Sequence, residues 1–291
     1  MKSLSSGCDC EGGPGNEKDT VLLDVNRSTG VAIITLKRGK FNQFTEEQTA
    51  KLNVVLTRCA NLAEVKAVVI TGAGRYYSAG ADFASSVVPQ MPSTMRAHIT
   101  AYNESVFESY LSFPKPLIAA INGPAIGMAV TSAALTDGIL ASELATFHTP
   151  FAQLSLPPEG CSSVNFERLM GARGVEVMLT KGVKINAAEA LAIGLAQEVL
   201  PPDQLLPRAI AKAGELARAY QNYVVQRPII QQGLVHEYRE VNRRESAALA
   251  KASLEAPFFR ANMEKAKAGG NRVGEWTFWT LLMMEPLISR L

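Results

Sequence analysis

Two glycine-rich turns, each directly after a short apolar run, carry the residues of this sequence that are best suited to chemistry. The first run, residues 66–71, leads through Gly-Ala-Gly into 77–82. The second, Leu117–Ile121, leads through Asn-Gly-Pro to Gly127, which opens a run of small residues typical of a tightly packed helix. Where a strand turns sharply into a helix, the first helical N–H groups lack intrahelical partners and lie at the positive end of the dipole. Such groups can bind an anion or a developing oxyanion, but an ordinary strand–turn–helix packing unit has the same pattern.

Charged side chains near these turns are few. Lys37, Arg38 and Lys40 crowd one loop after an apolar run, where they can meet phosphates or simply form a solvated turn. Glu159 follows two prolines in a loop and, taken alone, is typical of a solvated loop acid. Cys161 has no positioned base beside it, so the sequence does not indicate a covalent nucleophile there.

Predicted strands and helices alternate in the first part of the chain, and the remainder is predicted to be helical. Runs 21–25 and Val31–Leu36 predict a hairpin. Thr45 begins a capping-box pattern before a helical apolar face, and 94–111 also predicts a helix. An alternating first part followed by a helical remainder indicates an α/β core with a helical C-terminal subdomain. We therefore expect three parts, which are a disordered Gly- and Ser-rich tail at 1–19, an α/β core at 20–202, and a helical subdomain at 203–291.

The composition and net charge of the chain limit the classes of function that it can have. The 291 residues are 47% hydrophobic with a net charge of +2, which allows a large core and does not suggest nucleic-acid binding. The four cysteines form no zinc-like pattern, and we expect no metal and reduced thiols. No secretory signal or run near the roughly 20 residues of a membrane span is visible.

Several motifs together resemble the crotonase, or enoyl-CoA hydratase/isomerase, superfamily. They are Tyr-Ser-Ala-Gly-Ala-Asp at 77–82, Ala-Ile-Asn-Gly-Pro-Ala-Ile-Gly at 120–127 and Lys-Ile-Asn-Ala-Ala-Glu-Ala at 184–190. The segments 145–151 and 158–163 are similar to the peroxisomal Δ3,Δ2-enoyl-CoA isomerase branch. This resemblance implies a crotonase-like spiral of ββα turns, assembled as a homotrimer or hexamer.

The resemblance also implies a shared chemistry, in which two backbone N–H groups stabilise a thioester enolate. Carried across the motifs, these donors belong to Ala81 and Met128. Met at position 128, where many relatives have Gly, is no obstacle because backbone donors do not depend on the side chain. The expected substrate-binding residues are those of the two turns and the basic loop: Ser78, Ala79, Gly80, Ala81, Asp82, Gly127, Lys37, Arg38 and Lys40.

Departures from the family pattern suggest the reaction. Hydratases of the family use two glutamates, and those positions fall on Thr131 and Phe151, neither of which can act as a carboxylate base. Glu159 matches the single catalytic glutamate of the isomerase branch. One carboxylate suffices to remove a proton from C2 of a 3-enoyl-CoA and return it to C4, giving the trans-2-enoyl-CoA of unsaturated fatty acid β-oxidation. His148 and Asp82 are favoured as structural residues over catalytic ones.

Two alternatives stay open: a non-catalytic acyl-CoA-binding member of the family, and a CoA-thioester hydrolase. No cofactor is expected, because coenzyme A is part of the substrate. The final Ser289-Arg290-Leu291 resembles the Ser-Lys-Leu peroxisomal address, which predicts a peroxisomal location and recognition by the import receptor.

Overall fold

The first hairpin follows from alternating burial along two adjacent runs. The computed structural model describes residues 20–82, 92–221 and 226–288. Strand β1 (Val21–Asn26) pairs antiparallel with β2 (Val31–Leu36) in the register Val21 with Leu36. The hairpin is therefore confirmed, whereas the tail at 1–19 and the final tripeptide lie outside the described residues.

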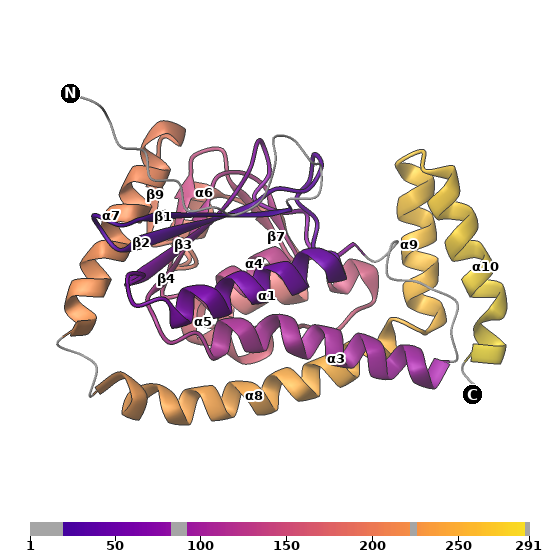
Figure 1. Cartoon of the computed structure of the whole chain (residues 1–291). Coiled ribbons are helices and arrows are strands. Elements are labelled where there is room, and N and C mark those ends of the chain that lie inside the picture. Colours follow the sequence, from indigo (N-terminus) through magenta and orange to yellow (C-terminus); the bar gives the residue numbers. More distant parts are fainter. Residues whose placement is uncertain (1–19, 83–91, 222–225, 289–291) are drawn as a thin grey trace, which may run out of the picture.

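The main sheet continues from β2 with parallel strands, of which the inner three, β3 (Ala67–Gly72), β4 (Leu117–Ile121) and β6 (Gly138–Ser142), are mostly apolar and almost fully buried. Helices cover both faces of this sheet, so its inner strands need no polar side (Figure 1). The strand order is β1-β2-β3-β4-β6-β9. The remaining strand of this sheet is β9 (Glu198–Leu200).

Helix α7 (Pro202–Gln221) covers one face of this sheet. Its buried Leu205, Ala209 and Ala213 form one cluster with Val31 and other sheet residues. By its packing α7 belongs with the α/β core, so the expected boundary after residue 202 divides one packed unit. The helical part that leaves the sheet begins after α7.

On the opposite face lie helices α1 (Glu46–Asn61) and α3 (Pro92–Leu111), whose apolar sides enter the largest core cluster. Thr45 caps α1 by accepting the Gln48 N–H at 3.3 Å. The capping box is only half formed, because the Gln48 side chain donates to the Thr20 carbonyl at 3.2 Å instead.

A second, small sheet lies beside the glycine turns. It joins β5 (Ala125–Ile126), β7 (Thr146–His148) and β8 (Ile185–Asn186) in the order β5-β7-β8. Short helices connect its strands to the core: α4 (Met128–Ala133), the 3₁₀ turn η1 (Ala152–Leu154), α5 (Ser162–Val175), the π turn η2 (Glu176–Thr180) and α6 (Ala187–Ala192).

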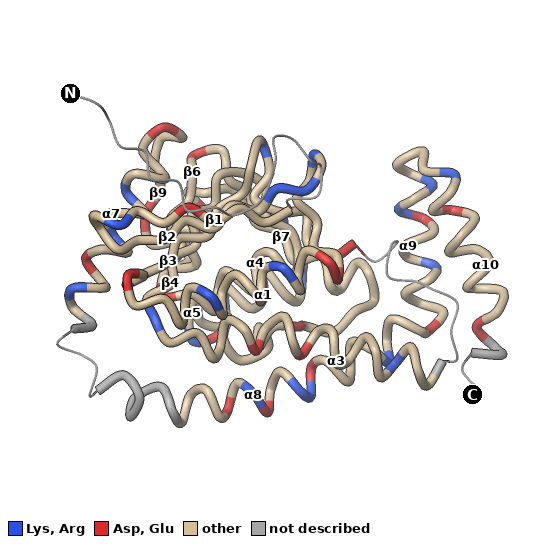
Figure 2. Tube along the Cα trace, in the orientation of Figure 1, with Lys and Arg blue, Asp and Glu red and all other residues tan. Residues whose placement is uncertain are grey.

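Three helices complete the chain: α8 (Gln226–Ala252), α9 (Ala256–Ala268) and α10 (Arg272–Ile288). Helix α8 runs alongside α3, and α9 and α10 pack side by side at the end of the molecule opposite α7 (Figure 1). Basic and acidic positions are interleaved along α8 where it runs beside α3 (Figure 2). One of the resulting contacts joins Arg239 to Glu108 at 2.6 Å. The mixed α/β class with a helical C-terminal region is thus confirmed.

Within the described ranges, no helix combines the length and apolarity needed to cross a bilayer.

Candidate active site

The two glycine turns meet directly, because backbone bonds join them. Ile126 donates its N–H to the Ser78 carbonyl at 3.1 Å, and Ser78 donates its N–H to Pro124 at 3.3 Å. Gly80, with φ of 81°, lies against this strand so closely that a Cβ there would come 2.4 Å from the Ile126 oxygen and 3.6 Å from the Met128 nitrogen. Only glycine fits this position, and the fit brings the two turns to one cavity.

Ala81 and Met128 present unpaired N–H groups at this junction. Their neighbours are engaged: Asp82 donates its N–H to Phe44 at 2.9 Å, and Gly127 donates to His148 at 2.8 Å. Within the described part of the chain, neither Ala81 nor Met128 has an acceptor for its N–H. Met128 is also the first residue of α4, so its N–H belongs to the unpaired set at a helix start.

Glu159 lies across the same cavity, in the loop that precedes α5. Its side chain is only 4% exposed, and its Oε2 atom is buried without a hydrogen-bond partner among the described residues. Burial, followed by the negative charge of Glu245, raises the pKa of Glu159 to about 8. A carboxyl of this kind can both take up and release a proton near neutral pH.

The loop that carries Glu159 is held in an unusual backbone conformation. Gly160 has φ of 65°, and a Cβ there would come 2.5 Å from the Phe107 ring and 2.9 Å from the Thr131 side chain. Ser162 bonds back to the Glu159 carbonyl through its hydroxyl at 2.6 Å. These contacts fix the direction in which the Glu159 side chain leaves the backbone.

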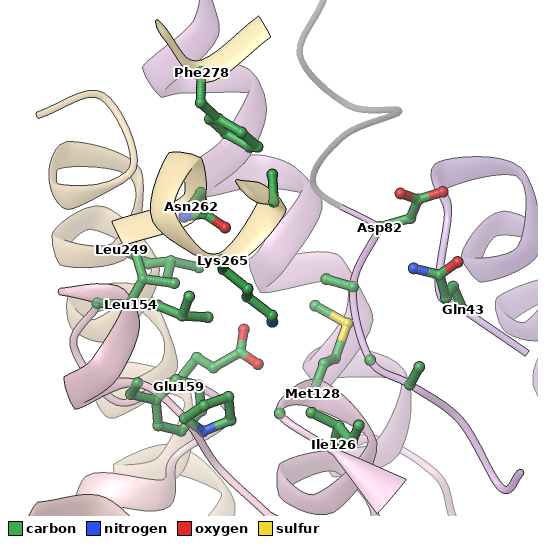
Figure 3. A pocket seen from close by; sticks show the side chains of 18 of the residues that line it. Gln43, Asp82, Ile126, Met128, Leu154, Glu159, Leu249, Asn262, Lys265 and Phe278 are labelled. Carbon is green, nitrogen blue, oxygen red and sulfur yellow. The ribbon is translucent and has the colours of Figure 1, made fainter. Parts of the chain in front are cut away.

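The cavity has a volume of about 350 Å³ and is mostly apolar. Glu159 and Lys265 point toward one another inside it, with Met128 beside them (Figure 3). The lining residues come from both glycine turns, from the loop before α5 and from the last three helices: Gln43, Ala79, Gly80, Ala81, Asp82, Ile126, Gly127, Met128, Pro150, Phe151, Leu154, Leu156, Glu159, Leu249, Asn262, Lys265, Ala266, Gly269, Asn271 and Phe278.

Comparison with known proteins identifies the family to which this architecture belongs. Residues 26–268 match the family model described as enoyl-CoA hydratase/isomerase. The chain belongs to the enoyl-CoA hydratase/isomerase family. A crystal structure of an enoyl-CoA hydratase/isomerase from Pseudoalteromonas atlantica matches with a TM-score of 0.75 at 25% identity, covering 86% of this chain and 97% of that one. The crotonase fold is therefore confirmed.

Two curated relatives carry more specific names. Enoyl-CoA delta isomerase 2 of Rattus norvegicus is 36% identical over 209 residues, which are 69% of this chain and 53% of the relative. Peroxisomal enoyl-CoA delta isomerase 3 of Mus musculus is 44% identical over 135 residues, which are 46% of this chain and 42% of the relative. The chain therefore spans about half the length of these relatives.

In this member of the enoyl-CoA hydratase/isomerase family, the two positions expected for hydratase glutamates carry no carboxylate. Thr131 is fully buried and donates its hydroxyl to the Met128 carbonyl at 3.3 Å. Phe151 is part of the cavity wall. Glu159 is thus the carboxylate that faces Met128 across the cavity, while Asp82 lies on the far side, 3.6 Å from Arg38 (Figure 3).

The other predicted binding residues fall in two groups. Ala79, Gly80, Asp82 and Gly127 line the cavity with the two donors. Ser78 does not line it: its fully buried hydroxyl accepts the Gly80 N–H at 3.1 Å and shapes the turn.

The basic loop lies beside the cavity rather than in its wall. Arg38 reaches Asp82, which does line the cavity, whereas Lys40 lies over the Phe41 ring at 5.6 Å. Lys37 is not among the lining residues either. A ligand that extends out of the cavity past Asp82 would meet this loop.

His148 makes hydrogen bonds through both its ring and its backbone. Its Nε2 atom lies 3.1 Å from the Gly182 carbonyl, which can only accept, so the ring donates. Burial lowers the pKa of His148 and favours the neutral ring. Its backbone carbonyl in turn holds Gly127 beside the donors.

Sequence reasoning missed the cavity wall supplied by the C-terminal helices. Leu249, Asn262, Lys265 and Phe278 line the cavity from α8, α9 and α10. Phe278 packs against Phe258 with ring centroids 6.2 Å apart, and it also faces the cavity. No local motif marks these residues, because their role arises from helix placement alone.

Among the described residues, no group of three or more His, Cys, Asp or Glu side chains is arranged to hold a metal ion.

Proposed function

We propose that this chain moves the double bond of 3-enoyl-CoA thioesters to give trans-2-enoyl-CoA, with Glu159 as the proton carrier. The observation that carries the proposal is the buried Glu159 carboxylate, which faces the Ala81 and Met128 N–H groups in one cavity; among the described residues, neither its Oε2 atom nor either N–H group has a hydrogen-bond partner. The names of the two curated relatives, both enoyl-CoA delta isomerases, support the same reaction class.

In the proposed first step, the Glu159 carboxylate removes a proton from C2. The C2–H electron pair moves into the conjugated system, and negative charge develops on the thioester oxygen. The N–H groups of Ala81 and Met128 are preorganised to stabilise this charge, and a single such donor typically contributes about 10²–10³ in rate. In the second step, Glu159 returns the proton to C4, which leaves the double bond between C2 and C3.

A raised pKa suits both steps. Glu159 must accept a carbon-bound proton and then release it, and catalysis of this kind is most efficient when the pKa lies near the working pH. The apolar wall of Phe151, Leu154, Leu156 and Phe278 suits a hydrocarbon chain next to the reacting carbons. The missing second carboxylate disfavours hydration, which needs one group to activate water and another to deliver a proton.

Two assays run side by side test the proposal. Absorbance follows double-bond migration in a 3-enoyl-CoA, and a thiol reagent follows release of free CoA. We expect migration without thiol release, and loss of migration in Glu159→Gln. Thiol release would indicate a thioester hydrolase, and acyl-CoA binding with neither signal would indicate a non-catalytic binding protein. Wild-type turnover in Glu159→Gln would contradict the role of Glu159.

The proposal extends to a peroxisomal location and to assembly as a trimer or hexamer. The name of the mouse relative includes the word peroxisomal, which supports the location. A fluorescent fusion that leaves the carboxyl end free, compared with one that lacks the last three residues, tests it. Light scattering tests the assembly.

A further inference from the structure

We propose that Glu245 is a positioning residue for Glu159: from helix α8 it clamps the backbone of the loop that carries Glu159. This inference rests on the proposed function and adds a residue from the helical C-terminal region to the reaction. Glu245 is not a lining residue of the cavity, so it acts through Glu159 rather than on the substrate.

The clamp consists of two hydrogen bonds to one carboxylate. Glu245 Oε2 accepts the Cys161 N–H at 2.7 Å, and Oε1 accepts the Ser163 N–H at 2.9 Å. Both donors lie at the start of α5, whose N-cap position, Cys161, makes no side-chain capping bond of its own. A distant residue thus performs the capping role that a Ser, Thr, Asp or Asn normally performs at this place.

The clamped backbone is one that the chain would not adopt unaided. Cys161 has φ of 62°, and Gly160 before it has φ of 65°. A left-handed conformation is easy for glycine but unfavourable for a residue with a Cβ. An unfavourable backbone conformation persists when several surrounding contacts hold it in place. Glu245 supplies that constraint two residues after Glu159.

Glu245 is itself held firmly. Its neighbour Ser246 accepts the Asn103 side-chain N–H at 2.8 Å, and Arg239, further along α8, binds Glu108. Tyr238 donates its hydroxyl to Asn165 of α5 at 2.7 Å. These contacts fix α8 against both α3 and α5, so the clamp keeps its place relative to the cavity.

Besides holding the loop in place, Glu245 affects Glu159 through its negative charge. Burial is the first cause of the raised pKa of Glu159 and the charge of Glu245 is the second. Burial also raises the pKa of Glu245, whereas its bonds from Ser163 and Cys161, together with the charge of Arg244, favour its ionised form. The other titratable groups that face Glu159 are Tyr102 of α3 and Lys265 of α9.

Two substitutions separate the effect of the Glu245 charge from the effect of its side-chain length. Glu245→Gln keeps the length but removes the charge and one acceptor oxygen, whereas Glu245→Asp keeps the charge and shortens the reach. Glu240→Gln is the matched control, because Glu240 lies on the same helix and pairs with Arg243 at the exposed surface. All are assayed for kcat and KM across pH. The C=O infrared band of protonated Glu159, identified by its absence in Glu159→Gln, is titrated separately.

We expect kcat of Glu245→Gln to fall on the order of 10- to 100-fold with little change in KM, as for misplacement of a reacting group. The acid limb of its kcat–pH profile and the midpoint of its infrared titration should both move to lower pH than the wild-type midpoint of about 8. Glu245→Asp should lose kcat while both midpoints stay. Glu240→Gln should match the wild type.

An unchanged infrared midpoint in Glu245→Gln, with a loss of kcat no greater than that of Glu240→Gln, overturns the proposal. If Glu245→Gln does not fold, wild-type kcat in Glu245→Asp overturns it. The infrared titration needs no turnover, so absence of isomerisation in the wild type would refute the proposed function alone and leave the test of Glu245 intact.

Discussion

Gly80 lies against the carbonyl of Ile126 so closely that a Cβ at position 80 would come 2.4 Å from that oxygen. This contact joins two turns that are more than 40 residues apart in sequence, and it lets Ala81 and Met128 present their N–H groups to one cavity. Because of this close contact, a single methyl group added at position 80 should disturb the proposed oxyanion site.

We therefore predict that Gly80→Ala lowers kcat by about 10²–10³, the effect of losing one donor, because the added methyl pushes the two turns apart. Gly74→Ala is the matched control: Gly74 also has a positive φ of 71°, but nothing lies within 4 Å of its Cβ position. The control should lose about 1–2 kcal/mol of stability and keep its kcat. Equal kcat losses in the two variants would show that backbone strain, rather than the contact, matters.

The ionisation of Glu159 should oppose folding. In the unfolded chain this carboxyl titrates near 4.5, whereas in the folded protein it titrates at about 8. Between these values the folded state holds a proton that the unfolded state has lost, so stability falls as pH rises through this window. Each unit corresponds to about 1.36 kcal/mol, which gives an effect of the order of 5 kcal/mol across the whole window.

Glu159→Gln should consequently gain stability over the wild type as pH rises from 4.5 to 8, while losing activity. Denaturant unfolding of both proteins at several pH values measures the difference. Acids that are not coupled to Glu159 are common to both proteins, so the difference reports Glu159 together with its coupling to Glu245. A stability difference that does not depend on pH would contradict the raised pKa.

Lys265 should bind the anionic part of the substrate. It lines the cavity from α9, and its side chain points toward Glu159 inside the cavity (Figure 3). Lys265→Gln should raise KM about tenfold or more, the usual effect of a lost charged hydrogen bond. Lys267→Gln is the control, since Lys267 is in the last turn of the same helix and does not line the cavity. If the two variants shift KM equally, general charge rather than a contact is responsible.

The basic loop should contribute weaker, longer-range attraction. Replacing Lys37, Arg38 and Lys40 by neutral residues should raise KM modestly and flatten its salt dependence, because exposed charges are screened over about 8–10 Å. The chemical step should be nearly intact. A variant of Lys212 and Arg218 on α7, which lies away from the cavity helices, is the control (Figures 1 and 2). Unchanged KM and salt response in the triple variant would place the phosphates elsewhere.

The sequence alone determined the parts of this protein that depend on local backbone chemistry. Strands predicted at 66–71 and 117–121 and the glycines that follow them indicated two turns with unpaired N–H groups, because a sharp strand–turn–helix leaves such groups without intrahelical partners. The family resemblance then predicted Ala81 and Met128 as the two donors. The absence of carboxylates at Thr131 and Phe151 could likewise be read directly once the family was recognised.

Tertiary structure decided what surrounds those parts. Glu159 appears in the sequence as a solvated loop acid, and it becomes buried only in the folded structure, in a cavity that is lined in part by α8 and α9. Glu245 is 84 residues from the Cys161 N–H that it accepts, and Lys265 reaches the cavity from a helix with no recognisable motif. The burial of a side chain and the charges close to it depend on many surrounding residues, most of which are distant in the sequence. The family resemblance in the sequence predicts Glu159 as the proton carrier, but the proton affinity of this carboxyl depends on the assembled fold.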